Sequence, residues 1–177
     1  MNQESHQHIY LTGYRGTGKS SVGRILAQRM TRTLVDLDDR IESAAGKTIR
    51  EIFDDGGEAA FRDWETKCLE LVVAEANEVV ALGGGAILRQ QNRQLIADSG
   101  LCVWLDADAN TLAQRIFADE STADRRPSLT QLSPADEIRQ MLDQRAPLYQ
   151  EASHYRVDTG GKTPEEIAAE IIHLLST

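Results

Sequence analysis

The segment Gly13–Ser20, which reads Gly-Tyr-Arg-Gly-Thr-Gly-Lys-Ser, constrains this chain more than any other feature. It fits the pattern G-x-x-x-x-G-K-[ST] and lies between a strand-like run at 8–12 and a helical stretch. Glycines let such a loop wrap around phosphate, where consecutive N–H groups and the N-terminus of the following helix meet the negative charge. The pattern predicts a nucleoside triphosphate site, with Lys19 at the β- and γ-phosphates and the Ser20 hydroxyl on magnesium. The residues expected to hold the nucleotide are Gly16, Thr17, Gly18, Lys19, Ser20 and Ser21.

The remainder of the chain alternates short β-branched runs with longer helical patterns. The later strand-like runs lie at 33–36, 78–82, 101–106 and 154–158. Helical patterns in the intervals include 57–76, 109–118, 134–146 and 163–175. Such alternation with apolar strands is typical of a parallel sheet covered on both faces. The sequence predicts an α/β fold, a single doubly wound domain over residues 1–177 with a five-stranded parallel sheet and a frayed segment at 1–7.

Length and charge disfavour several classes of protein. A chain of 177 residues fits one domain that buries a core without disulfides. Its 28 acidic residues outnumber its 19 basic ones, and the net charge of −9 argues against nucleic-acid or anionic-membrane partners. Cys68 and Cys102 form no CxxC pattern and are interpreted as core residues. The polar N-terminus, MNQESHQH, has no hydrophobic signal core, so we expect a cytoplasmic protein.

A long polar segment, DESTADRRPSLTQLS, interrupts the alternation at 119–133. Unstructured segments of this length are uncommon in compact domains and often act as lids. Arg125 and Arg126 favour a lid that closes on phosphate, and an ordinary surface loop is the alternative.

Three carboxylates follow the second predicted strand, in the order Asp36-Leu-Asp38-Asp39. Side chains two apart on an extended segment point to one side, so Asp36 and Asp38 are expected to lie together. They would stand at the carboxyl edge of the sheet, where ligands bind in doubly wound folds. There Asp36 could hold magnesium through water, and Asp38 could accept a proton or hydrogen bond from a substrate hydroxyl. The alternative is that they are turn residues or helix caps, the role expected of Asp39.

Glycine and arginine supply further candidate binding elements. The triple glycine at 83–85 permits close approach of a ligand, or else forms a tight turn. Arg145 falls in the apolar stripe of the 134–146 helix, where a buried guanidinium needs an anion, although it could also snorkel to solvent. Arg62 lies at the edge of another stripe, and an ordinary ion pair with Glu65 one turn later would equally explain it.

Taken together, these residues resemble the shikimate kinase family. The phosphate loop, the D-x-D at 36–38 and the F-R-x-x-E at 61–65 occur in the family's order. The triple glycine, the lid pair Arg126-Pro127 and the R-x-P-x-Y at 145–149 follow. The phosphate loop alone is shared by many families, whereas the five further motifs at fitting intervals are much more specific.

The resemblance implies a P-loop kinase fold and transfer of the ATP γ-phosphoryl group to the 3-hydroxyl of shikimate, in aromatic amino acid biosynthesis. It implies catalytic roles for Lys19, Asp38 and Arg126, with Arg126 closing from the lid onto the phosphates. Ser20, with Asp36 through water, would hold Mg²⁺. The residues implied in shikimate binding are Asp38, Arg62, Gly84 and Arg145.

The implied contacts with adenine are less specific. The family pattern places Arg115 and the backbone around Asp158–Thr159 beside the base. The residue pattern alone favours a solvated charge at Arg115.

Two other classes compete with this interpretation. A gluconate kinase or a nucleoside monophosphate kinase would share Lys19, Ser20 and an arginine-bearing lid, without predicting the other motifs. A GTP-dependent switch is matched loosely by D-x-x-G at 54–57 and 158–161, but the guanine-reading [NT]-K-x-D element is absent from the sequence. We expect a monomer that acts on a small molecule.

Overall fold

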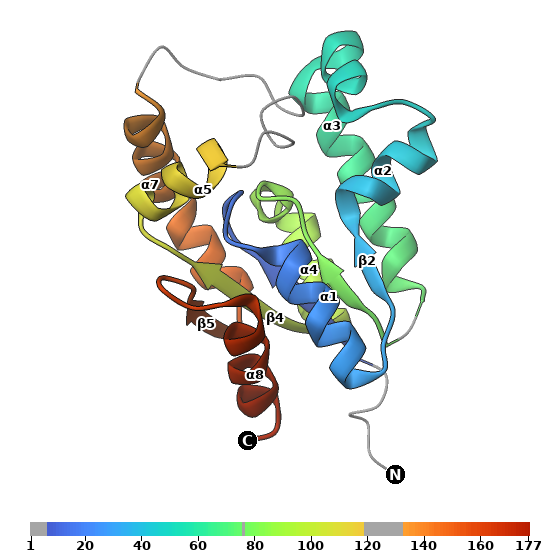
Figure 1. Cartoon of the computed structure of the whole chain (residues 1–177). Helices are drawn as coiled ribbons and strands as arrows, with labels where there is room; N and C mark the ends of the chain where they lie inside the picture. The colour runs from blue at the N-terminus through green and yellow to red at the C-terminus, as the bar shows by residue number, and fades with distance from the viewer. Residues whose placement is uncertain (1–6, 76, 119–132) are drawn as a thin grey trace.

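The computed structural model of the protein describes residues 7–75, 77–118 and 133–177. In these residues five parallel strands form a sheet in the order β2-β3-β1-β4-β5 (Figure 1). The strands are β1 (His8–Thr12), β2 (Leu34–Asp36), β3 (Val79–Ala81), β4 (Gly100–Asp106) and β5 (Tyr155–Asp158). The predicted α/β class and five-stranded parallel sheet are therefore confirmed, and each strand end lies within one residue of its prediction.

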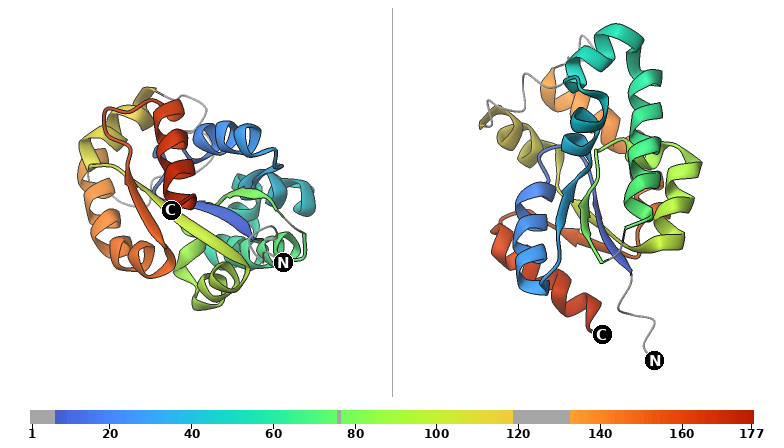
Figure 2. Two further views of the ribbon diagram at one scale, coloured as in Figure 1. Left: turned by 90° about the horizontal axis from the view of Figure 1, so that it is seen from below. Right: turned by 90° about the vertical axis from the view of Figure 1, so that its right-hand side faces the viewer.

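Helices cover both faces of the sheet, because each central strand is apolar on both sides. In β1, Ile9 and Leu11 join a core cluster that includes residues of α1 (Lys19–Met30) and α8 (Pro164–Leu175). Tyr10, between them, joins the cluster on the opposite face. The helices of that face are α2 (Leu37–Ala45), α3 (Ile49–Val73), α4 (Gln90–Ser99) and α7 (Pro134–Ala152). Figure 2 shows the sheet between these two layers.

The strand order brings two loops together at the carboxyl edge of the sheet. β1 pairs with β3 on one side and with β4 on the other. The segments that follow β1 and β3 therefore leave the sheet side by side, at an edge where doubly wound folds bind their ligands. One of these segments is the phosphate loop and the other is the triple glycine.

The helix predicted at 57–76 begins earlier than expected. α3 starts at Ile49, where Thr48 caps the helix and Glu51 completes a capping box. Gly57, with φ 68° and ψ −167°, interrupts the helical geometry inside α3, and the helix ends at Val73. The prediction treated this interruption as the start of the helix, because the two glycines at 56–57 separate the two apolar patterns.

The helix predicted at 134–146 continues to Ala152, through Pro147. Proline inside a helix removes one backbone hydrogen bond and crowds the preceding turn. The buried side chains of Tyr149 and Ala152 lie beyond it. Their burial in the core favours continuation and outweighs the local cost.

The remaining elements complete the described chain. α5 (Ala109–Ala118) matches its prediction, and a short 3₁₀ turn, η2 (Ala86–Leu88), follows the triple glycine. Cys68 and Cys102 are free thiols buried in the core, as expected. No described helix is long and apolar enough to cross a membrane. The predictions for 1–6 and for almost all of the lid at 119–133 lie outside the described residues.

Candidate active site

The phosphate loop joins β1 to α1 in a geometry that only glycine adopts readily. Gly16 and Gly18 have φ of 84° and 90°, in the left-handed region. Gly18 is the N-cap residue of α1, and no side chain caps that helix. Thr17 is buried and its hydroxyl donates to Tyr14 O at 2.7 Å, which fixes the turn. The first-turn N–H groups of α1 therefore form a site for an anion.

Lys19 folds back over this loop. Its Nζ donates to Gly13 O at 2.8 Å and to Tyr14 O at 2.9 Å. The ammonium group is thus held across the mouth of the loop, where it can shift to phosphate oxygens by exchanging these carbonyl contacts. A lysine at this position supplies charge to the transferring group in nucleotide-hydrolysing and phosphoryl-transferring proteins.

Ser20 and Asp36 meet beside Lys19. The Ser20 hydroxyl donates to Asp36 Oδ2 at 2.6 Å, joining the first turn of α1 to the end of β2. Hydroxyl and carboxylate oxygens are hard ligands that suit Mg²⁺, which keeps most of its waters and uses few protein groups. The donor set therefore fits magnesium bound together with phosphate. No cluster of three or more potential metal ligands of the His, Cys, Asp and Glu types occurs in the described ranges.

The extended geometry expected for Asp36 and Asp38 is wrong. The strand ends at Asp36, and α2 begins at the next residue. Asp36 is the N-cap of α2, and its Oδ1 accepts from the Asp38 N–H at 3.1 Å. The capping role considered for Asp39 therefore belongs to Asp36. The two residues remain in contact through this backbone hydrogen bond, which replaces the side-by-side carboxylates of the extended prediction.

The triple glycine forms a tight turn against the phosphate loop. Ala86 N–H donates to Gly83 O at 3.0 Å, and all three glycines are buried. A Cβ on Gly84 would lie 3.3 Å from Gly13 O and 3.5 Å from Arg15 N. The close approach and the tight turn, considered as alternatives from the sequence, are thus both present.

Arg62 reaches this turn from α3 and is only 8% exposed. Its Nη1 pairs with Glu65 Oε2 at 2.8 Å, and its Nη2 pairs with Glu58 Oε1 at 3.1 Å. Burial acts to lower the pKa of Arg62, but the charges and hydrogen bonds of Glu65 and Glu58 outweigh it, and the net pKa is raised. The guanidinium therefore stays charged and is oriented by both carboxylates.

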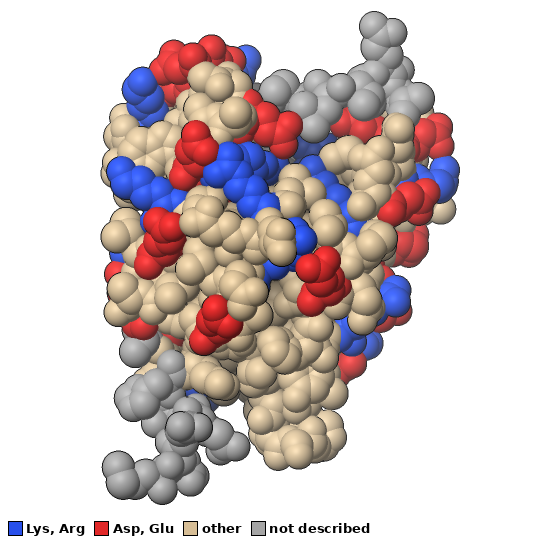
Figure 3. Space-filling model, turned by 180° about the vertical axis from the view of Figure 1, so that it is seen from behind, with Lys and Arg blue, Asp and Glu red and all other residues tan. Residues whose placement is uncertain are grey.

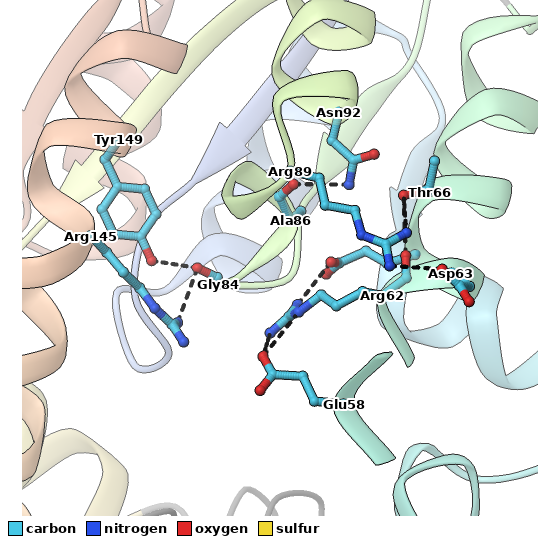
Figure 4. Close-up of polar contacts among 11 residues, drawn as sticks. Glu58, Arg62, Asp63, Thr66, Gly84, Ala86, Arg89, Asn92, Arg145 and Tyr149 are labelled. Atoms are coloured by element: carbon cyan, nitrogen blue, oxygen red, sulfur yellow. Dashed lines mark hydrogen bonds and ion pairs between the residues drawn. The ribbon is translucent and has the colours of Figure 1, made fainter. Parts of the chain in front are cut away.

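Arg145 reaches the same turn from α7 and is 9% exposed. Its Nη1 donates to Gly84 O at 3.3 Å, and its Cζ lies 5.9 Å from the centre of the Tyr14 ring. The Tyr149 hydroxyl donates to the same carbonyl at 2.5 Å. Figure 4 shows Arg145 and Arg62 on opposite sides of Gly84. The snorkelling alternative for Arg145 is therefore wrong, because its guanidinium is turned inward.

Arg115 is not the solvated charge that its pattern favoured. Its Nη2 donates to Thr159 O at 2.7 Å, and its Nη1 donates to Thr159 Oγ1 at 2.9 Å and to Gly16 O at 3.3 Å. α5 therefore holds the loop after β5 against the phosphate loop. Arg115 and Thr159, which the family resemblance paired, lie together.

Two side chains near the site received no role from the sequence, and one predicted site residue is not tested by the structure. Glu58 was not singled out, although it stands one helical turn before Arg62. The Tyr149 hydroxyl was part of a motif but received no role. Arg126 lies outside the described residues. In Figure 3 basic and acidic side chains lie interspersed on this face, mostly in its upper half.

Comparison with known proteins identifies the family of this chain. The family model described as shikimate kinase matches residues 15–176. A shikimate kinase of Rhodopirellula baltica is 49% identical over 166 residues, spanning 94% of this chain and 89% of that protein. The solved structure of a shikimate kinase from Acinetobacter baumannii in complex with shikimate is 36% identical, with a TM-score of 0.90, over 98% of this chain and 94% of that one.

A more distant likeness concerns the fold alone. A gluconokinase from Sinorhizobium meliloti is 17% identical with a TM-score of 0.60, covering 96% of this chain and 91% of that one, which indicates a shared fold alone. The fold and the phosphate loop thus define a P-loop kinase that phosphorylates a small molecule. Within that class, the chain belongs to the shikimate kinase family.

Proposed function

We propose that this enzyme transfers the γ-phosphoryl group of ATP to the 3-hydroxyl of shikimate, giving shikimate 3-phosphate for aromatic amino acid biosynthesis. The observation that carries the proposal is the pair of buried guanidinium groups, Arg62 and Arg145, on either side of Gly84 and next to the phosphate loop. Two arginines beside a turn of glycines suit a small anionic acceptor, because guanidinium groups bind carboxylates through paired hydrogen bonds.

On the donor side, the loop Gly16–Ser21 binds the nucleotide phosphates through backbone N–H groups. Lys19 moves from its carbonyl partners to the β- and γ-phosphates and neutralises charge on the group in transfer. Ser20 and Asp36, whose side chains meet through a hydrogen bond, would hold Mg²⁺, Asp36 through water. When bound, the ion supplies further positive charge at the phosphates.

On the acceptor side, Arg62 and Arg145 bind the carboxylate of shikimate, and the Gly84 turn bounds its ring. Asp38 stands at the start of α2 beside the magnesium ligand Asp36 and accepts a hydrogen bond from a ring hydroxyl. Because phosphoryl transfer has a loose transition state, this orientation contributes more than early removal of the proton. Asp38 receives that proton as the new P–O bond forms.

Three further assignments rest on the family resemblance. Arg126 closes from the lid onto the phosphates, and Arg115 with the backbone around Asp158–Thr159 flanks adenine. The contact of Arg115 with Thr159 supports the second of these. Residues 1–177 act as one catalytic domain, monomeric and cytoplasmic, with no nucleic-acid or membrane partner.

A coupled assay of ATP consumption tests the proposal. Shikimate, gluconate and AMP are compared in parallel at saturating Mg²⁺. We expect strong stimulation by shikimate, little by the other two, and loss of activity when EDTA removes the metal. Equal stimulation by gluconate would overturn the choice of acceptor while leaving the kinase class intact.

A further inference from the structure

The turn at the triple glycine is built from residues whose backbone could also adopt a second turn type. Gly84 and Gly85 are its central residues, because Ala86 N–H donates to Gly83 O. Gly85 has φ −110° and ψ 5°, close to the third residue of a type I turn at about −90° and 0°. A glycine there adopts almost as readily the φ of about +80° that a type II turn requires. The two turns differ by a flip of the Gly84–Gly85 peptide, so the sequence leaves its orientation open.

This freedom is a consequence of how closely Arg62 approaches. A Cβ on Gly85 would overlap the guanidinium group of Arg62. Only glycine therefore lets the buried cation lie against the turn. A larger residue that would favour one turn type does not fit at position 85. A contact from outside the turn therefore has to select the orientation of the Gly84–Gly85 peptide.

Tyr149 makes that contact. Its hydroxyl donates to Gly84 O at 2.5 Å, whereas Arg145 Nη1 is 3.3 Å from the same oxygen, beyond the usual range of about 2.7–3.2 Å. The Tyr149 ring is fully buried and stacks on Trp104, with the ring centres 5.6 Å apart. The phenol is therefore the closer and more rigidly held partner of the carbonyl.

The direction of the carbonyl also sets the direction of the next N–H. In a trans peptide the C=O and N–H bonds point to opposite sides. With Gly84 O turned toward α7, the Gly85 N–H points away from α7, and Figure 4 shows Arg62 on that side of Gly84. Among the described residues, no backbone carbonyl accepts a hydrogen bond from this N–H.

We propose that the Tyr149 hydroxyl is a positioning group that selects this orientation of the Gly84–Gly85 peptide, so that the Gly85 N–H and the donors of Arg62 face the anionic acceptor. After a flip, the carbonyl oxygen would face Arg62 and compete with the acceptor carboxylate for its donors. The inference rests on the proposed function, because it concerns the same acceptor. Tyr149 contacts Gly84 and acts through it.

Other contacts hold the ends of the turn independently of Tyr149. The Asn92 side chain is buried and donates to Ala86 O at 2.9 Å, and Leu88 N–H donates to Gly85 O at 3.1 Å. Removing the phenol oxygen therefore leaves Gly84 O with only the longer Arg145 contact, without releasing the loop. Tyr149→Phe keeps the stacked ring and is expected to fold.

The matched control is Tyr10→Phe. Tyr10 is also fully buried, and its hydroxyl bonds to Ser99 Oγ at 2.7 Å, just before the start of β4 and thus at the opposite edge of the sheet. Each variant loses the hydrogen bond of a fully buried tyrosine ring, worth about 1 kcal/mol, and both should lower Tm. We expect only Tyr149→Phe to raise the shikimate KM, by about 5- to 20-fold, with kcat within about twofold and ATP Kd unchanged.

A double-mutant cycle with Arg145→Lys separates positioning from general stability. If Tyr149 acts through the shared carbonyl, the two KM effects are not additive, whereas independent effects add. An unchanged shikimate KM in folded Tyr149→Phe, or an equal rise in Tyr10→Phe, would overturn the inference and leave the proposed function standing. If the wild type gave no shikimate-dependent ATP consumption in the same assay, the proposed function and this inference would both be wrong.

Discussion

The proposed donor and acceptor sides of the site are built in different ways. On the donor side, the main groups come from one continuous segment, Gly13–Ser20, whose glycines and helix N-terminus form the phosphate loop. On the acceptor side, Arg62 comes from α3, Gly84 from the turn after β3, and Arg145 from α7. These residues meet only because β3 pairs with β1 and because α3 and α7 cover the same face.

The two sides differ in how far apart in the sequence their stabilising contacts lie. The donor loop is fixed by backbone geometry and by contacts a few residues apart, such as Lys19 to Gly13. The acceptor side depends on contacts across 61 and 65 residues of sequence, between α7 and Gly84. We therefore expect substitutions on the donor side to act on the transfer step, and those on the acceptor side to act on recognition of the second substrate.

The largest effect is expected from Lys19→Ala. Loss of the ammonium removes charge stabilisation from the group in transfer, so kcat should fall by about 100- to 1000-fold. The fold should persist, because the two carbonyls that Lys19 contacts are in the loop and the residue is only half-buried. Steady-state kinetics and thermal melting measure both outcomes.

Lys47→Ala is the control for charge, since Lys47 is exposed and pairs with Asp55. It should leave kcat unchanged. A Lys19→Ala protein with near-normal kcat would show that this loop does not act on the phosphoryl group, and the contrast between the two sides would fail.

Arg145→Lys tests the acceptor side. Lysine keeps the charge but lacks the planar fork that binds a carboxylate through two hydrogen bonds. Loss of one charge-assisted hydrogen bond, about 1.5–3 kcal/mol, should raise the shikimate KM by about 10- to 150-fold. ATP affinity measured without shikimate should barely change.

Arg139→Lys is the matched control, because Arg139 lies on the exposed side of α7 and pairs with Asp136. It should have no effect on KM. If Arg145→Lys lowered thermal stability and left shikimate kinetics intact, Arg145 would be a structural residue of the α7 interface.

The contrast between local contacts on the donor side and long-range contacts on the acceptor side explains which features could be predicted from the sequence. The phosphate loop and the five strands were predictable, because their signals are local and repeat with a short period. The inward position of Arg145 was left undecided, since an apolar stripe does not tell whether a guanidinium finds a carbonyl or reaches solvent. The family resemblance supplied the acceptor residues that periodicity could not.

Where the prediction was wrong, tertiary contacts or caps decided the outcome. α7 passes through Pro147 because Tyr149 is needed in the core, and no local rule contains that requirement. Asp36 caps α2, so a helix begins directly after the predicted strand end and Asp38 does not lie on an extended segment. Arg115 contacts the backbone of Thr159, which is 44 residues away and belongs to another strand's loop.

Asp36→Asn tests the metal ligands within the donor side. Asparagine caps helices about as well as aspartate, so α2 should keep its N-terminus and Tm should change little. The lost negative charge should raise the Mg²⁺ concentration needed for half-maximal activity by about tenfold, equivalent to ~1.4 kcal/mol. A magnesium titration at fixed ATP and shikimate gives this value.

Asp108→Asn is a suitable comparison, because Asp108 also caps a helix, accepting from the N–H groups of Asn110 and Thr111. Its magnesium requirement should equal that of the wild type. An unchanged requirement in Asp36→Asn would remove Asp36 from the metal site and leave it as a cap.

The smallest effect is expected from Glu58→Gln, on the acceptor side. Two carboxylates orient Arg62, but the side chain of Glu65 is fully buried while that of Glu58 is 55% exposed. An exposed ion pair contributes about 0–1 kcal/mol, and glutamine still accepts a hydrogen bond from the guanidinium. The shikimate KM should therefore rise by about threefold or less, with the rise shrinking further at high salt. Glu65→Gln should instead cost substantial stability, because it leaves a buried cation with its exposed partner alone. A KM rise above about tenfold in Glu58→Gln would show that the exposed carboxylate sets the position of Arg62, and that acceptor recognition depends on the surface end of α3 as much as on the core.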